Sequence, residues 1–139
     1  MEKLKIGIAG LGRIGIIHLN NLLQMSNVEV LAAMDPDIET QKYAKNKGIK
    51  LIFKAYKDLL NVNEVNALII CTPTDTHAEY VELAALEGKN VFCEKPLDLN
   101  INREVEVLEI VKKTKIKLMK GFKRRFDNEL VSVKERIEN

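Results

Sequence analysis

Three glycines at the spacing G-x-G-x-x-G, in Gly10-Leu11-Gly12-Arg13-Ile14-Gly15, constrain the fold of this chain more than any other feature. The apolar run Leu4–Ala9 directly precedes them and is typical of a strand. Over 13–24, apolar residues recur at helical spacing. In such a strand–turn–helix unit the first glycine permits the tight turn, the second leaves room beside the main chain, and the third lets the helix lie close to the strand.

The rest of the chain repeats the alternation of short strands and longer helices. Strands are expected at 4–9, 28–34, 51–53, 67–71, 90–93 and 115–120. Helices are expected at 13–24, from the cap at Asp35 or Asp37 to about 47, at 76–87, 102–114 and 128–138, with a turn or helix at 56–60. Repeated β-α-β units predict an α/β protein with a doubly wound parallel sheet, the three-layer α/β/α Rossmann dinucleotide-binding fold.

Two finer predictions concern the second half of the chain. The helix at 102–114 is expected to pack through Val105, Leu108 and Val111. The lysines that alternate along 115–120 favour an edge strand, because charge at an edge discourages further pairing.

The glycine turn and a carboxylate after the second strand indicate a dinucleotide site. Backbone N–H groups at the start of the first helix would receive a pyrophosphate, so all six residues from Gly10 to Gly15 are candidate cofactor ligands. Asp35 follows Gly15 by twenty residues, which suits a carboxylate that accepts hydrogen bonds from the adenosine ribose. Asp35 is alternatively a helix cap, although Asp37 can take that role. The acidic Asp35, Asp37 and Glu39 favour NAD over NADP.

Composition excludes several other classes of protein. The 139 residues carry a net charge of +2, 46% hydrophobic residues and two cysteines, which argues against a nucleic-acid-binding protein and against a metal site. No apolar run is long enough to span a membrane, and no secretory signal opens the chain, so a cytoplasmic location is expected. The eight basic residues over 112–125 are interpreted as a solvated edge.

Three segments in the second half carry a resemblance to a known family. They are Cys71-Thr72-Pro73-Thr74-Asp75-Thr76-His77, then Glu94-Lys95-Pro96-Leu97, and finally Gly121-Phe122-Lys123-Arg124-Arg125-Phe126-Asp127. Together with the glycine turn they resemble the Gfo/Idh/MocA oxidoreductases, and most closely the inositol 2-dehydrogenase branch. Lys123 and Asn128 depart from the family's usual residues.

The resemblance implies a set of site residues around the cofactor. Thr72, Pro73 and Thr74 would line the cofactor, and Lys95 would be the catalytic residue that reaches the nicotinamide and the substrate hydroxyl. Glu94 either orients Lys95 or contacts the cofactor, and Lys95-Pro96 is a candidate cis bond. His77 is interpreted as a neutral hydrogen-bonding residue near the cofactor.

Other side chains receive structural interpretations. His18 is interpreted as a packing residue of the first helix. Cys71 and Cys93 end apolar strands and are interpreted as small core residues.

The resemblance also implies a division into domains and a function. Residues 1–126 would form the dinucleotide-binding domain, and 127–139 a helix at the junction to a substrate and oligomerisation domain that contributes the catalytic base. The implied function is that of the NAD-binding domain of a sugar or polyol oxidoreductase, with a homo-oligomer as the expected assembly. The 139 residues alone are expected to be inactive. The alternative is a non-catalytic NAD-binding or redox-sensing module that acts through a partner.

Overall fold

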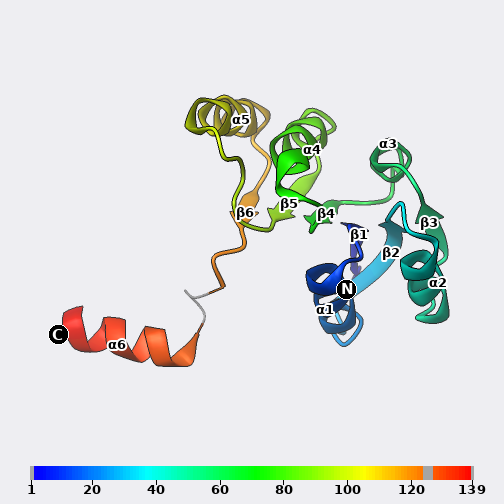
Figure 1. The fold of residues 1–139 in the computed structure, drawn as a ribbon, viewed down its shortest axis with the longest axis horizontal. Helices are drawn as coiled ribbons and strands as arrows, with labels where there is room; N and C mark the ends of the chain where they lie inside the picture. The colour runs from blue at the N-terminus through cyan, green and yellow to red at the C-terminus, as the bar shows by residue number, and fades with distance from the viewer. Residues whose placement is uncertain (1, 124–126, 139) are drawn as a thin grey trace.

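The computed structural model describes residues 2–123 and 127–138, and in this part of the chain strands and helices alternate from one end to the other (Figure 1). The strands are β1 (Leu4–Ala9), β2 (Val28–Met34), β3 (Leu51–Phe53), β4 (Ala67–Ile70), β5 (Asn90–Cys93) and β6 (Leu118–Lys120). The helices are α1 (Arg13–Leu22), α2 (Ile38–Asn46), α3 (Tyr56–Leu60), α4 (Thr74–Leu86), α5 (Ile101–Thr114) and α6 (Asn128–Glu138).

The six strands form one sheet in the order β3-β2-β1-β4-β5-β6, with every neighbouring pair parallel. This order, which reverses direction beside β1, confirms the predicted doubly wound fold. The register brings the last residues of the strands level with one another, from Phe53 through Met34, Ala9, Ile70 and Cys93 to Lys120. The loops after the strands therefore all start at one edge of the sheet.

Two apolar layers hold the helices to the sheet. Helices α3, α4 and α5 cover one face, and α1 and α2 cover the other (Figure 1). Leu68, Ile70, Val81 and Val107 belong to the first layer, and the second layer includes Ile8 and Leu19. Helix α6 lies apart from both layers in Figure 1.

The element bounds differ from the expected ones at a few ends. Helix α1 ends at Leu22, and β6 is the edge strand, as expected, but spans only Leu118–Lys120. Helix α4 begins at Thr74, two residues before the expected start, and Pro73 is its N-cap.

The expected packing face of α5 was wrong in part. Val105 and Leu108 are 49% and 39% exposed, whereas Val107 is fully buried. Val111 packs against the core, as expected.

Candidate functional site

The three glycines of the turn differ in what the surrounding chain requires of them. Gly10 has a φ of +89°, and a Cβ there would lie 2.7 Å from the Cys71 carbonyl. A Cβ on Gly15 would lie 1.9 Å from the Gly10 oxygen. Gly12 has an ordinary φ of −68°, and a Cβ there would meet no atom within 4 Å. The fold thus explains Gly10 and Gly15, and the open space at Gly12, the N-cap of α1, fits a ligand that approaches the main chain.

The Asp35 carboxylate ties the glycine turn to the end of β2. Asp35 is buried; its Oδ2 accepts a 2.6 Å hydrogen bond from the Leu11 N–H, and its Oδ1 accepts a 2.8 Å bond from the Asp37 N–H. Asp37 is the N-cap of α2, where its Oδ1 accepts bonds from Glu39 and Thr40. Capping and the position beside the turn therefore fall to different residues, as the sequence suggested. Since a carboxylate has about four lone-pair sites, Asp35 keeps capacity for ligand hydroxyls.

The loop after β4 leads straight into α4. Thr72 Oγ1 lies 2.6 Å from Thr76 Oγ1, which also donates to the Pro73 carbonyl. His77 is only 2% exposed, in the first turn of α4. Its Nε2 lies 2.7 Å from the Thr72 oxygen and its Nδ1 lies 2.7 Å from the Pro96 oxygen. His77 is a hydrogen-bonding residue, as expected, and it connects two of the candidate loops.

The loop after β5 presents Lys95 to solvent. The Lys95-Pro96 bond is cis, and Leu97, 1% exposed, anchors the loop in the core. Lys95 is exposed. The role at the cofactor and the substrate that the resemblance implies for Lys95 stays a prediction.

The Glu94 carboxylate contacts α1. His18 Nε2 lies 2.7 Å from Glu94 Oε1, and the His18 ring packs edge-on against Phe92 with 5.2 Å between centroids. The interpretation of His18 as a packing residue was therefore incomplete. Gly121 lies beneath the same carboxylate, since a Cβ there would be 2.9 Å from Glu94 Oε2. No local sequence pattern signals the His18–Glu94 contact, because the two residues are 76 positions apart in the chain.

A largely apolar hollow of about 400 Å³ adjoins the glycine turn and the His18–Glu94 pair. Its walls come from α1, β5, β6 and the segment after β6, and consist of Ile14, Ile17, His18, Phe92, Glu94, Met119, Gly121, Phe122 and Lys123. Sequence reasoning identified Ile14 and Glu94 as site residues and missed the other apolar walls, which become neighbours only through the strand order.

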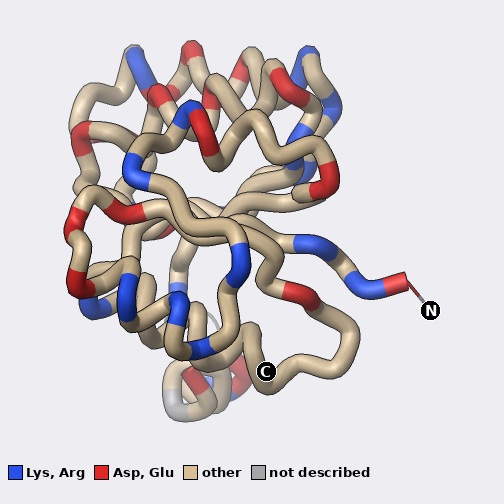
Figure 2. Tube along the Cα trace, turned by 90° about the vertical axis from the view of Figure 1, so that its right-hand side faces the viewer, with Lys and Arg blue, Asp and Glu red and all other residues tan. Residues whose placement is uncertain are grey.

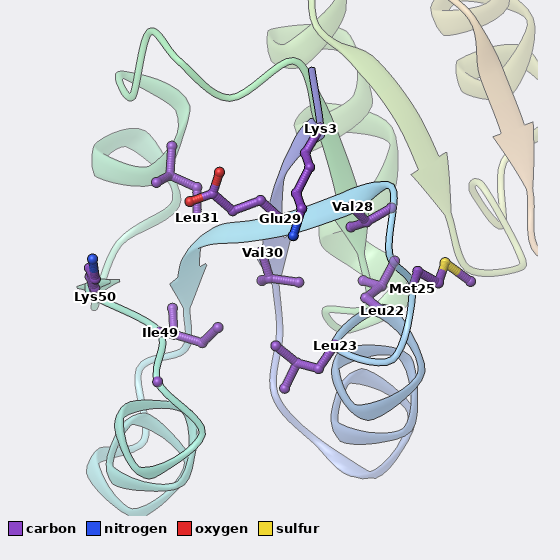
Figure 3. Close-up of a pocket in the computed structure, with 11 residues that line it drawn as sticks. Lys3, Leu22, Leu23, Met25, Val28, Glu29, Val30, Leu31, Ile49 and Lys50 are labelled. Carbon is purple, nitrogen blue, oxygen red and sulfur yellow. The ribbon is translucent and has the colours of Figure 1, made fainter. Parts of the chain in front are cut away.

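A second cavity, of about 260 Å³, lies at the opposite edge of the sheet (Figure 3). Leu22, Leu23, Val30 and Ile49 point toward one another there. Because open α/β sheets bind ligands at the carboxyl ends of their strands, the candidate site is the edge that carries the glycine turn.

Both thiols lie close to that edge and are poor nucleophiles. Burial, together with the nearby Glu94 charge, raises the pKa of Cys71 and Cys93 to about 12. Cys93 is fully buried and Cys71 partly so, in line with the expected core role.

The structure also bears on metal sites, membrane-spanning helices and the distribution of charge. Among the described residues there is no cluster of three or more His, Cys, Asp or Glu placed to hold a metal ion, and no helix long and apolar enough to cross a membrane. Basic and acidic residues are interspersed along the trace in Figure 2. Arg124 and Arg125, which belong to the third resembling segment, lie outside the described residues.

Comparison with known proteins agrees with this fold. Residues 4–122 match the model of the Gfo/Idh/MocA oxidoreductase family with the NAD-binding Rossmann fold. The chain is 38% identical to the myo-inositol 2-dehydrogenase of Thermotoga maritima over 98% of its own length, and 35% identical to an inositol 2-dehydrogenase of Rhizobium meliloti over 97%.

A solved structure, the scyllo-inositol dehydrogenase of Lactobacillus casei with bound NAD(H) and scyllo-inositol, superposes with a TM-score of 0.94 at 30% identity over 99% of the chain. The chain spans 41% of the length of each of these three relatives. Fold, glycine turn and family match lead to one conclusion: the chain belongs to the Gfo/Idh/MocA oxidoreductases and comprises their NAD-binding Rossmann fold.

Proposed function

We propose that this chain is the NAD-binding part of an oxidoreductase that transfers hydride between nicotinamide and a hydroxyl of an inositol-like polyol or sugar. The observation that carries the proposal is the open space at Gly12, which the packing of the chain does not explain and which a pyrophosphate would fill. The inositol dehydrogenases among the relatives support the substrate class.

In the proposed site, the two halves of the sheet bind different parts of the cofactor. The turn from Gly10 to Gly15 would hold the diphosphate, and Asp35 would accept bonds from the adenosine ribose. Thr72, Pro73, Thr74, His77 and Glu94 would border the nicotinamide half. When bound, NAD supplies the hydride acceptor, and the ammonium of Lys95 would hydrogen-bond the reacting oxygen of the substrate and stabilise its developing charge.

Domain boundaries, assembly and location are further parts of the proposal. Residues 1–126 would form the cofactor domain and 127–139, which include α6, the junction to a substrate domain. A homo-oligomer and a cytoplasmic location remain predictions from the resemblance and the sequence.

Cofactor choice provides the test. We expect the wild-type chain to bind NADH at least about tenfold more tightly than NADPH, measured by NADH fluorescence, because Asp35 and its acidic neighbours repel a 2′-phosphate. Asp35→Asn should weaken NADH binding about tenfold through the lost charge-assisted bonds and shrink the preference. Asp37→Asn, which keeps a capping acceptor, is the matched control and should change the affinity for NADH little. Tighter binding of NADPH than of NADH by the wild type would overturn the cofactor assignment.

A further inference from the structure

His77 joins the two loops that border the nicotinamide half of the proposed site. The Thr72 carbonyl belongs to the loop between β4 and α4, and the Pro96 carbonyl belongs to the loop between β5 and α5. Each lies 2.7 Å from a different ring nitrogen of His77. Side chains that hydrogen-bond two separate loops at once fix the distance between those loops.

The polar atoms of the buried His77 ring contact the Thr72 and Pro96 carbonyls. His77 is 2% exposed, so water does not compete for either ring nitrogen. Each ring nitrogen faces the carbonyl oxygen of a different loop at hydrogen-bond distance.

The loops that His77 connects carry the residues assigned to the nicotinamide half. Thr72 is itself one of them, and Lys95 directly precedes Pro96. The adenosine half is held elsewhere, by the glycine turn and by Asp35, whose carboxylate bonds to Leu11 and Asp37 rather than to either loop. A change at His77 therefore reaches one half of the cofactor site.

We propose that His77 is a positioning residue, which sets the spacing of the Thr72 and Lys95 loops and thereby the affinity for the nicotinamide half of the cofactor. This inference rests on the proposed NAD-binding function. It predicts that loss of His77 weakens the binding of NADH and leaves unchanged the affinity for a ligand that lacks nicotinamide.

The test compares NADH with ADP, which contains only the adenosine half, by calorimetric titration. His77→Phe keeps a buried ring and removes both contacts between ring nitrogens and carbonyl oxygens. We expect the Kd for NADH to rise about five- to tenfold and the Kd for ADP to stay within about twofold of the wild-type value. His77→Gln, whose amide can still donate to a carbonyl, should fall between the two and decides the matter should His77→Phe fail to fold.

Tyr56→Phe is the control for a purely structural effect. The Tyr56 hydroxyl donates a 2.8 Å bond to the Tyr80 carbonyl within α4, so this variant also loses a bond from a buried side chain to the backbone. It should lower the thermal midpoint without changing the ratio of the two affinities. An unchanged ratio in folded His77 variants would overturn the role of His77 and leave NAD binding intact. A folded wild-type chain that binds neither ligand would instead overturn the proposed function, and this inference with it.

Discussion

Single residues of the glycine turn differ in whether the fold or the ligand requires them. At Gly15 a methyl group would overlap the Gly10 carbonyl, so Gly15→Ala must displace α1 from β1. At Gly12 a methyl group has free space and an ordinary backbone angle. The same substitution, made three residues apart, therefore separates folding from binding.

We predict that Gly12→Ala unfolds with a free energy within about 0.5 kcal/mol of the wild-type value. It should nevertheless bind NADH at least about tenfold more weakly, because the methyl group occupies the space of the diphosphate. Gly15→Ala should lower the free energy of unfolding by about 1–3 kcal/mol or more, which is the usual cost of overpacking. Urea unfolding and NADH titration of both variants give the two quantities. Wild-type affinity in Gly12→Ala would show that no ligand uses this space.

The two buried thiols predict a dependence of stability on pH. Burial raises the pKa of Cys71 and Cys93 from 9.0 to about 12, so the thiols ionise first in the unfolded chain. The contribution of the two neutral thiols to the stability of the fold is fully present below pH 9 and is lost as the pH rises above 9. Between pH 9 and 10 we expect a loss on the order of 1 kcal/mol per thiol, measured as the difference between wild type and a Cys71→Ala/Cys93→Ala variant in urea. Identical pH profiles for the two proteins would contradict the raised pKa values.

At the scale of elements, local patterns were sufficient for most strands. Strands β1, β2, β3 and β5 lie where the apolar runs and their turn residues predicted them. The glycine spacing and the repeated alternation also predicted the doubly wound parallel sheet, and the observed strand order is one of the few arrangements that such a sheet permits. The loops after the strands meet at one edge for the same reason.

The sequence could not predict the contacts that depend on tertiary partners. Helix α5 has apolar residues on several sides, and ion pairs of Arg103 with Glu82 and of Glu104 with Lys120 accompany the side that packs. Periodicity alone therefore selected Val105 in place of Val107. The His18–Glu94 contact joins α1 to the end of β5, and neither residue shows its partner in the local sequence.

A buried lysine directly before β5 leads to a prediction about how the segments of the fold pack together. Lys89 is 7% exposed, and its Nζ donates 2.9 Å bonds to the carbonyls of Val62 and Val65, which lie in the segment between α3 and β4. Lys89→Met should lower the free energy of unfolding by about 2–3 kcal/mol, because it leaves two carbonyls without this donor.

NADH affinity should not change in this variant, since Lys89 precedes β5 at the edge opposite the site. Lys42→Met is the control. It removes an exposed pair with Glu39 and should cost less than about 0.5 kcal/mol. A loss of stability in Lys89→Met no greater than that in Lys42→Met would show that the bonds of Lys89 to the Val62 and Val65 carbonyls do not stabilise the fold.

At the scale of the whole molecule, the apolar hollow beside the turn is open to water. Ile17, Met119 and Phe122 in its walls are 48%, 46% and 39% exposed. Hydride transfer requires the substrate carbon to be held against the nicotinamide with water excluded. The described residues form the edge of the sheet that carries the proposed cofactor site and the exposed Lys95, and they do not enclose a substrate.

We therefore predict that the 139-residue chain binds NAD and does not oxidise myo-inositol or scyllo-inositol at a measurable rate. NADH absorbance in the presence of NAD and either polyol is the readout, with the Thermotoga maritima relative as the active control. Sustained NADH formation by this chain would show that these residues complete the catalytic site on their own.

Calorimetric titration of the folded wild-type chain with NADH tests the central claim most directly. The account predicts saturable heat with one site per chain, from a diphosphate on the N–H groups of the glycine turn and a ribose on Asp35. Absence of heat at millimolar NADH and NAD, in a chain whose circular dichroism and cooperative unfolding show the native fold, would contradict it.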